Sequence, residues 1–266
     1  MLSNEEKQII DCIVRSHLTK FADGFGKRHI KDHKNPEGTI NLKKQNVFMS
    51  KLPGELIYYS ALVRSFDSSF GTILEKIALE IGQNKYKVSR EVRGKIDSRQ
   101  LDHIRDILTN YKNRKFVPEV SHYSDYNTPS FSLQDAHHAS DHLLFDEEEN
   151  TYHIIELKSG GDLDNKKAKA EKDALLEQYF ILKNSNPNVN IKLHFATAYN
   201  KFGEEQRWTN PNVETFFSRD ELLIGKDFWN FICKDEEGFK TVISSYEKNI
   251  HIIAQVLEEI REVYAI

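Results

Sequence analysis

Two acidic residues and a lysine stand at the ends of two short apolar segments near the middle of the chain. Asp141 opens the segment 142–145, and Glu156 and Lys158 follow the segment 152–155. Because side chains alternate between the two faces of a strand, Glu156 and Lys158 point the same way if the second segment is a strand. Residues 146–150 are short, polar and acidic, as in a hairpin connection. An antiparallel hairpin would place Asp141 beside this face.

These three side chains have the chemistry needed to hydrolyse a phosphodiester. Two converging carboxylates form a hard oxygen site of the kind Mg²⁺ takes, together with water and phosphate oxygens. A metal so bound polarises a phosphoryl oxygen and generates hydroxide from its water. A neighbouring lysine activates that water or stabilises negative charge in the transition state. The alternative is a solvated ion pair on one face of a strand, which contributes little.

Composition indicates a soluble protein. The chain has 266 residues, of which 39% are hydrophobic and 29% charged, with no apolar run as long as a membrane span. Its acidic start lacks the layout of a signal peptide. Cys12 and Cys233 are the only cysteines and lie far apart, which argues against a disulfide framework. We therefore expect a cytoplasmic protein.

The net charge of −4 hides two basic stretches. Residues 85–115 contain ten Lys or Arg against four acids, a net of +6, and residues 27–51 are also basic. Such stretches can track nucleic-acid phosphates, although solvated helix and loop faces have the same composition. The candidates for contacts to DNA phosphates in the first stretch are Arg90, Arg93, Lys95 and Arg99.

Hydrophobic periodicity predicts a mainly helical first part. Ser3 and Glu6 form a capping box for a helix over 3–22 that ends at Gly24 and Gly26. After it we expect a loop or arm over 27–45, helix over most of 46–82, a strand over 86–92, a helix over 98–110 and a loop over 117–135.

The pattern of the second part predicts a sheet and three further helices. Strands are expected at 141–146, 151–158 and 190–199, with an amphipathic helix over 165–183 between the last two. Strand–helix–strand spacing implies a parallel crossover, so the sheet should be mixed. A loop over 203–220 precedes helices over 226–233 and about 239–264.

Other side chains are candidates to support the site. Glu75 lies beside the apolar stripe of its helix, with no basic residue three or four positions away on that helix. Gln178 on the 165–183 helix is a candidate to hold a water or Lys158. Asp135 and Asp141 with His137, His138 and His142 could ligate zinc, but we favour one of these histidines as a group that touches a phosphate or orients an acid. Asp135 and His138 are the candidates to surround the site. For Glu75 and Gln178, ordinary helix-surface positions are the alternative.

The spacing Asp141…Glu156-x-Lys158 in this setting resembles the PD-(D/E)xK nuclease superfamily, although Ser140 stands where the family name has proline. Further segments resemble type II restriction endonucleases of the TdeIII-type family, and the last is similar to a "GxxFW" element of several restriction enzymes. These segments are 62–78, 134–145, 156–182 and 222–232. The implied fold is an α/β restriction-endonuclease-like core, a mixed central sheet flanked by helices, with helical N- and C-terminal additions.

The resemblance implies Mg²⁺-dependent cleavage of double-stranded DNA at a short palindrome by a homodimer, with a cognate DNA methyltransferase encoded nearby. It associates the family with GGNCC sites. Asp141 and Glu156 would bind Mg²⁺, Lys158 would position and activate water, and Glu75 would be an accessory acid. Base-reading residues are expected in the loops 117–135 and 200–220, where Arg207 could contact guanine.

We expect one nuclease domain over 1–266, with a helical and basic DNA-contacting part (1–116), a catalytic core sheet (130–200), and a specificity loop with C-terminal helices (200–266). Two alternatives remain. One is a nuclease of the same fold without a fixed recognition sequence, acting in repair or phage defence. The other is a non-catalytic DNA-binding module in which the three charged residues form a structural ion cluster.

Overall fold

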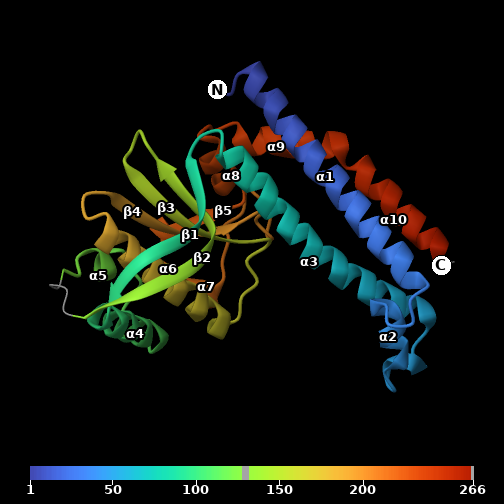
Figure 1. The fold of residues 1–266 in the computed structure, drawn as a ribbon, viewed down its shortest axis with the longest axis horizontal. Coiled ribbons are helices and arrows are strands. Elements are labelled where there is room, and N and C mark those ends of the chain that lie inside the picture. Colours follow the sequence, from blue (N-terminus) through green and yellow to red (C-terminus); the bar gives the residue numbers. More distant parts are fainter. Residues whose placement is uncertain (128–131, 265–266) are drawn as a thin grey trace. The chain divides into compact units, whose positions relative to one another are not determined.

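The computed structural model describes residues 1–127 and 132–264, and for Ala139 and Asp141 it describes the backbone alone. The chain divides into two compact units (Figure 1). Unit 1 comprises Met1–Glu80 and Lys240–Ile266, and unit 2 comprises Ile81–Phe239. No helix in the described part of the chain is long and apolar enough to cross a membrane.

Unit 1 is helical. Its elements are α1 (Asn4–His33), α2 (Thr39–Gln45), the 3-10 turn η1 (Met49–Lys51), most of α3 (Gly54–Gly82), most of α9 (Gly238–Asn249) and α10 (His251–Val263). The capping box of Ser3 and Glu6 at the start of α1 is confirmed.

Two helix boundaries predicted in unit 1 are wrong. Helix α1 continues through Gly24 and Gly26 to His33, and much of the expected 27–45 loop is helical. The reason is packing against α10: a Cβ on Gly26 would lie 2.5 Å from Cγ2 of Val256, so this glycine serves close helix contact, not helix termination. The single C-terminal helix expected over 239–264 is instead two helices that meet at Ile250.

Unit 2 contains the sheet. Its strands are β1 (Lys87–Asp97), β2 (Leu133–Asp146), β3 (Thr151–Lys158), β4 (Asn190–Thr197) and β5 (Leu222–Ile224). Its helices are α4 (Ser98–Lys112), α5 (Ser121–Ser124), α6 (Asn165–Ser185), α7 (Pro211–Glu214), the 3-10 turn η2 (Arg219–Glu221) and α8 (Lys226–Cys233).

The sheet has the order β1-β2-β3-β4-β5. Strands β1, β2 and β3 pair antiparallel, whereas β4 and β5 are added in parallel, which confirms the mixed sheet with a leading hairpin and a parallel crossover. Strands β1 and β2 are longer than predicted because they pair with each other from Asp97 and Leu133 onward. The loop expected over 117–135 is therefore shorter, and its residues 128–131 lie outside the described residues.

Each face of the sheet has its own cover. Helices α6 and α4 lie along one face, where Ile154, Leu176 and Leu193 belong to one buried cluster (Figure 1). On the other face, Phe231 of α8 packs against the imidazole rings of His153 and His194, 4.9 and 5.5 Å between ring centroids.

These two histidines form a buried polar pair, with Nδ1 of His153 3.0 Å from Nε2 of His194. Burial lowers the pKa of His153 to about 4 and that of His194 to about 3, and the charge of nearby Lys192 acts in the same direction. Both rings are therefore neutral in the folded protein at pH 7.

Acid should destabilise unit 2 through this pair. Below an ordinary histidine pKa of about 6.5 the unfolded chain binds protons that the folded pair does not, so stability falls as the pH falls from about 6.5 towards 4. Each histidine contributes at most about 1.4 kcal/mol per pH unit, and we expect a loss of about 1–3 kcal/mol between pH 7 and 5. Denaturant unfolding followed by tryptophan fluorescence measures this, because Trp208 and Trp229 both lie in unit 2.

The double variant His153→Leu/His194→Leu should flatten this pH dependence. The matched control is His251→Gln, which replaces an exposed histidine and should leave the dependence unchanged. An unaltered slope in the double variant would contradict the assignment.

Candidate functional site

The predicted pair Glu156 and Lys158 lies at the carboxyl end of β3. Both side chains point to the face covered by α6, and the ammonium of Lys158 donates a hydrogen bond to Oε1 of Glu156. Strand alternation predicted this shared face, because Leu157 between them is buried on the other side. The pair is partly buried, so its charges interact with less solvent screening than at a free surface.

A second carboxylate, which sequence reasoning missed, meets the same lysine. Oε1 of Glu171 on α6 lies 3.1 Å from Nζ of Lys158. Burial alone lowers the pKa of Lys158, but Glu156 and Glu171 outweigh burial and raise it above its ordinary value. Lys158 is therefore an ammonium at neutral pH, suited to donate hydrogen bonds and to hold negative charge. Glu171 had no distinguishing signal in the sequence except its place on the helix after β3.

Asp141 lies on β2 next to an irregularity in the sheet. The β2–β3 register ends at the pair His142–Ile155, so the next positions along the two strands are Asp141 and Glu156. Between β1 and β2 the register shifts: Ser89 pairs with Leu143 but Glu91 pairs with Ala139, which leaves Arg90 alone opposite residues 140–142. Bulges of this kind often re-aim side chains next to active sites. The side chain of Asp141 is outside the described part of the structure.

The loop after β3 is fixed by its neighbours. Gly161 has φ +74°, which favours glycine, and a Cβ there would lie 2.7 Å from Cγ2 of Thr197. Its carbonyl accepts a hydrogen bond from Nδ2 of Asn210 at 2.8 Å. Asp164 caps α6 by accepting from the backbone N–H of Lys167 at 2.8 Å. This turn therefore sets where α6 begins and presents Glu171 to the end of β3.

The other residues that were predicted to support the site lie in different environments. His138 on β2 lies 2.7 Å from a carboxylate oxygen of Glu177 on α6. Gln178 is buried on α6, and its Oε1 has no hydrogen-bond partner among the described residues. Asp135 is exposed and pairs in register with Lys95 of β1. Glu75 belongs to unit 1, whereas the other residues lie in unit 2.

The described residues bring no histidine cluster together on β2. His137 and His138 are neighbours on a strand and therefore point to opposite faces, towards Glu91 and Glu177 respectively. A different group, Asp146 with Glu149 and His153, gathers at the hairpin end of β3.

The hairpin group has a structural explanation. The carboxylate of Asp146 accepts hydrogen bonds from the backbone N–H groups of Glu148 and Glu149, and Nζ of Lys234 lies 2.8 Å away. Burial would raise the pKa of Asp146, but these hydrogen bonds and the charge of Lys234 outweigh it and lower the pKa. The group caps the turn between β2 and β3.

The donor set at the other end of β3 fits a hard divalent cation. Glu156 offers carboxylate oxygens at the end of β3, and Asp141 occupies the neighbouring position on β2, so the two acids predicted to bind the metal belong to adjacent strands. Oxygen ligands of this type are those that Mg²⁺ prefers.

The predicted DNA-contacting residues of unit 2 do not share one face. Arg90 is exposed at the bulge beside residues 140–142. Arg93 and Lys95 are exposed and alternate with Val92 and Ile96, which are buried, so they point away from α6. Arg207 is exposed and lines a pocket of about 660 Å³ together with Arg219.

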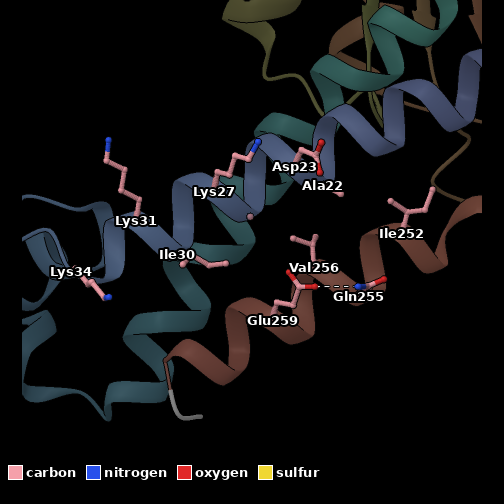
Figure 2. Close-up of a pocket in the computed structure, with 11 residues that line it drawn as sticks. Ala22, Asp23, Lys27, Ile30, Lys31, Lys34, Ile252, Gln255, Val256 and Glu259 are labelled. Carbon is pink, nitrogen blue, oxygen red and sulfur yellow. Dashed lines mark hydrogen bonds between the residues drawn. The ribbon is translucent and has the colours of Figure 1, made fainter.

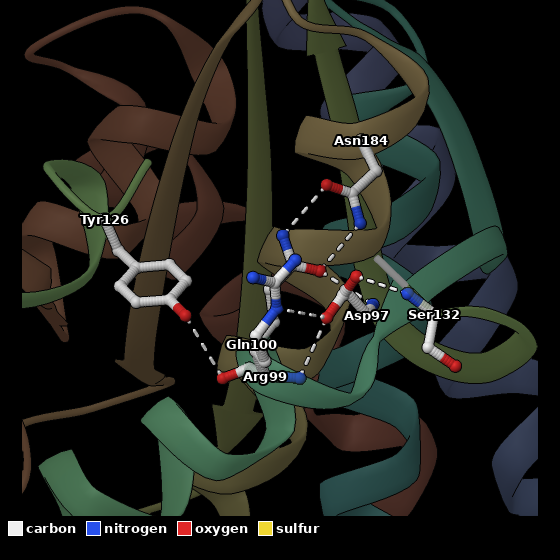
Figure 3. Close-up of polar contacts among 6 residues, drawn as sticks. All are labelled: Asp97, Arg99, Gln100, Tyr126, Ser132 and Asn184. Carbon is white, nitrogen blue, oxygen red and sulfur yellow. Dashed lines mark hydrogen bonds and ion pairs between the residues drawn. The ribbon is translucent and has the colours of Figure 1, made fainter. Parts of the chain in front are cut away.

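Arg99 is part of a polar network at the start of α4 (Figure 3). Its Nε lies 3.4 Å from Oδ1 of Asp97, and its carbonyl accepts a hydrogen bond from the hydroxyl of Tyr126. Gln100 donates to Asn184 of α6, and Asp97 accepts from the backbone N–H of Ser132. The network ties the ends of β1, β2 and α6 together.

Unit 1 has its own basic surface. A groove of about 760 Å³ lies between α1 and α10, and Lys27, Lys31 and Lys34 line it near the C-terminal end of α1 (Figure 2). Lys27 and Lys31 are four residues apart on α1, and Lys34 is the residue that follows the helix. This row lies in the stretch 27–51 that the sequence marks as basic.

Comparison with known proteins gives one family. A family model described as type II restriction endonuclease, HinfI, matches residues 5–249. The comparison with curated proteins finds no match. The matched range spans nearly the whole chain: it contains all of unit 2 and most of unit 1, and ends before α10.

Proposed function

We propose that this chain, which belongs to the HinfI family of type II restriction endonucleases, cuts both strands of DNA at a short palindromic site in a Mg²⁺-dependent reaction. A type II restriction endonuclease is a site-specific deoxyribonuclease that acts on double-stranded DNA. The observation that supports the assignment of the site is the convergence of Glu156, Glu171 and Lys158 at the end of β3. Asp141 is the neighbouring position on β2, one residue beyond the last pair of the β2–β3 register.

In this mechanism each side chain has a separate role. Asp141 and Glu156 would hold Mg²⁺, which would supply a Lewis acid for the scissile phosphate and lower the pKa of a water molecule. Lys158, kept protonated by its two carboxylates, donates hydrogen bonds to the attacking water or to the phosphate and balances the negative charge that grows there. Glu171 would keep Lys158 in place while Glu156 served as a metal ligand. We propose Glu75 as an accessory acid.

The proposal extends to the oligomeric state, a partner enzyme, the recognition sequence and the compartment. A homodimer matches the two-fold symmetry of a palindrome, and a cognate DNA methyltransferase would protect the host. The GGNCC sequence is tied to the TdeIII-type resemblance and is proposed on that ground alone. Arg207 is the candidate base-reading residue, and the cytoplasm is the proposed compartment.

Removal of any of the three central side chains should abolish cleavage. We expect Asp141→Ala, Glu156→Ala and Lys158→Ala to lower the rate of plasmid cleavage with Mg²⁺ by about 10³-fold or more, because each removes charge from the reacting centre. The matched control is Asp162→Asn, which changes an exposed acid in the adjacent loop and should cut normally. Gel electrophoresis of plasmid digests and duplex binding in Ca²⁺ measure both effects.

The same digests separate the alternative functions. Discrete fragments indicate a fixed recognition sequence, a smear indicates a nuclease without one, and duplex binding without cleavage in Mg²⁺ or Mn²⁺ indicates a non-catalytic module. Normal cleavage by Lys158→Ala would overturn the assignment of the site.

Glu171 should act through Lys158 and not through general stability. Glu171→Gln removes one of the two carboxylates that hold the ammonium, so we expect kcat to fall by about 10-fold with KM little changed. Glu177→Gln is the matched control, since it changes a partly exposed glutamate of the same helix that pairs with His138 instead. Single-turnover cleavage with thermal unfolding of each variant measures this. Equal loss in both variants would contradict the role.

The lysine row of unit 1 should contact DNA phosphates. Replacing Lys27, Lys31 and Lys34 by Gln should weaken binding to all duplex sequences alike and reduce the slope of log K against log[salt] by about 2.7, which is about 0.9 for each lost phosphate contact. Lys20→Gln, an exposed lysine of the same helix outside the groove, should change the slope much less. Fluorescence anisotropy at several salt concentrations provides the measurement, and an unchanged slope in the triple variant would exclude these contacts.

A further inference from the structure

The most unusual surface in the described structure is an apolar one on unit 1. Seven of the fourteen exposed large hydrophobic side chains fall within residues 42–63. They are Leu42, Val47, Phe48, Leu52, Leu56, Tyr59 and Val63, and we name them the 42–63 apolar face. Isolated apolar residues at a surface are ordinary, but a contiguous group of large ones marks an interaction site.

Helix α3 is apolar on two sides, which a surface helix does not require. One side, with Ile57, Tyr58 and Ala61, is buried in the core of unit 1. The other carries Leu56, Tyr59 and Val63, whose side chains are 51%, 42% and 53% exposed. A helix with one covered stripe needs only one apolar face, so the second stripe calls for a partner.

The second stripe has the spacing of a helix–helix seam. Leu56, Tyr59 and Val63 are three and four residues apart, the a-d-a pattern of a heptad repeat. Phe48 and Leu52, which are 84% and 40% exposed, flank the 3-10 turn η1 shortly before α3 begins. The seven side chains present roughly 700 Å² of surface, near the about 800 Å² that each partner buries in a stable interface.

The charges around the stripe match a second copy of the same surface. With Leu56 and Val63 at a, Glu55 stands at g and Ser60 at e, the positions that face each other across a coiled coil. Nζ of Lys43 donates a hydrogen bond to Oγ of Ser60 at 3.0 Å. Pairing of two copies therefore brings the carboxylate of Glu55 in one copy near the ammonium of Lys43 in the other, and two-fold symmetry makes this contact twice.

We infer that the 42–63 apolar face is the surface on which a second copy of this chain docks, through α3 of each copy. This names the interface of the homodimer in the proposed function and rests on that function only for its biological purpose. Its test measures mass and proximity, not cleavage, so the two proposals fail separately. A monomer that cuts at a fixed site overturns the interface and the homodimer but not the nuclease assignment, and a dimer that never cuts DNA overturns the nuclease assignment alone.

Sedimentation velocity of the full chain over the micromolar range tests the interface. Wild type should be a dimer, and Leu56→Glu and Val63→Glu should each raise the dimer Kd by about 100-fold or more, because a desolvated carboxylate replaces a contact at the seam. Val117→Glu, the same change at another exposed valine, should leave the dimer intact. The inference is overturned if wild type is a monomer, or if Leu56→Glu and Val63→Glu leave the dimer Kd unchanged.

Two further measurements do not depend on the folding of the glutamate variants. In a Cys12→Ser background, Leu56→Cys should form a cross-linked dimer with a short bismaleimide, whereas Val117→Cys should not; equal cross-linking of both overturns the inference. Glu55→Lys should weaken the dimer by about 10-fold, and Glu55→Lys/Lys43→Glu should restore it. Failure of the double variant to restore the dimer would overturn the proposed pairing of Glu55 with Lys43.

Discussion

A buried ion pair fixes the helix on which the candidate site depends. Lys172 of α6 donates to Oε1 of Glu221 in η2, and both side chains are almost completely buried. The hydroxyl of Tyr123 donates to the same oxygen at 2.8 Å, while the backbone N–H of Ser218 donates to the other oxygen at 2.8 Å. Nζ of Lys172 also lies 4.9 Å from the ring centroid of Phe217. Leaving either charge alone there would cost about 3–5 kcal/mol, so α6 is held in one rotation.

That rotation decides what α6 presents to the sheet. Glu171 precedes Lys172, so burial of Lys172 turns Glu171 about 100° around the helix, towards the end of β3, where it meets Lys158. Gln178, seven residues and about two turns after Glu171, is also buried. The parallel pairing of β3 with β4 fixes the other partner, because Glu156 and Lys158 lie opposite Phe195 and Thr197. The charged cluster therefore follows from two constraints, a buried ion pair and a strand register.

Local sequence predicted the elements whose own residues specify them. Strand β3 was predicted from the apolar alternation of 151–158. Helix α6 was predicted from the amphipathic pattern of 165–183, and its start from the capping residue Asp164. The shared face of Glu156 and Lys158 followed from strand alternation alone. The prediction was wrong where a contact with a distant segment sets the length of an element. Gly26 resembles a helix end in the local sequence, but close contact with Val256 of α10 requires a glycine there. The length of β1 depends on its pairing with β2.

The sequence by itself thus determined the mixed α/β class, the helix and strand at the centre, and two of the charged groups of the site. Periodicity and alternation are properties of neighbouring residues, and they suffice for those. Only the tertiary structure decided that Glu171 joins Lys158, that Lys172 and Glu221 are buried together, and that β2 is bulged over residues 140–142, opposite Arg90 of β1. Each of these depends on segments far apart in the chain, where burial and register select the contacts and local residue type does not.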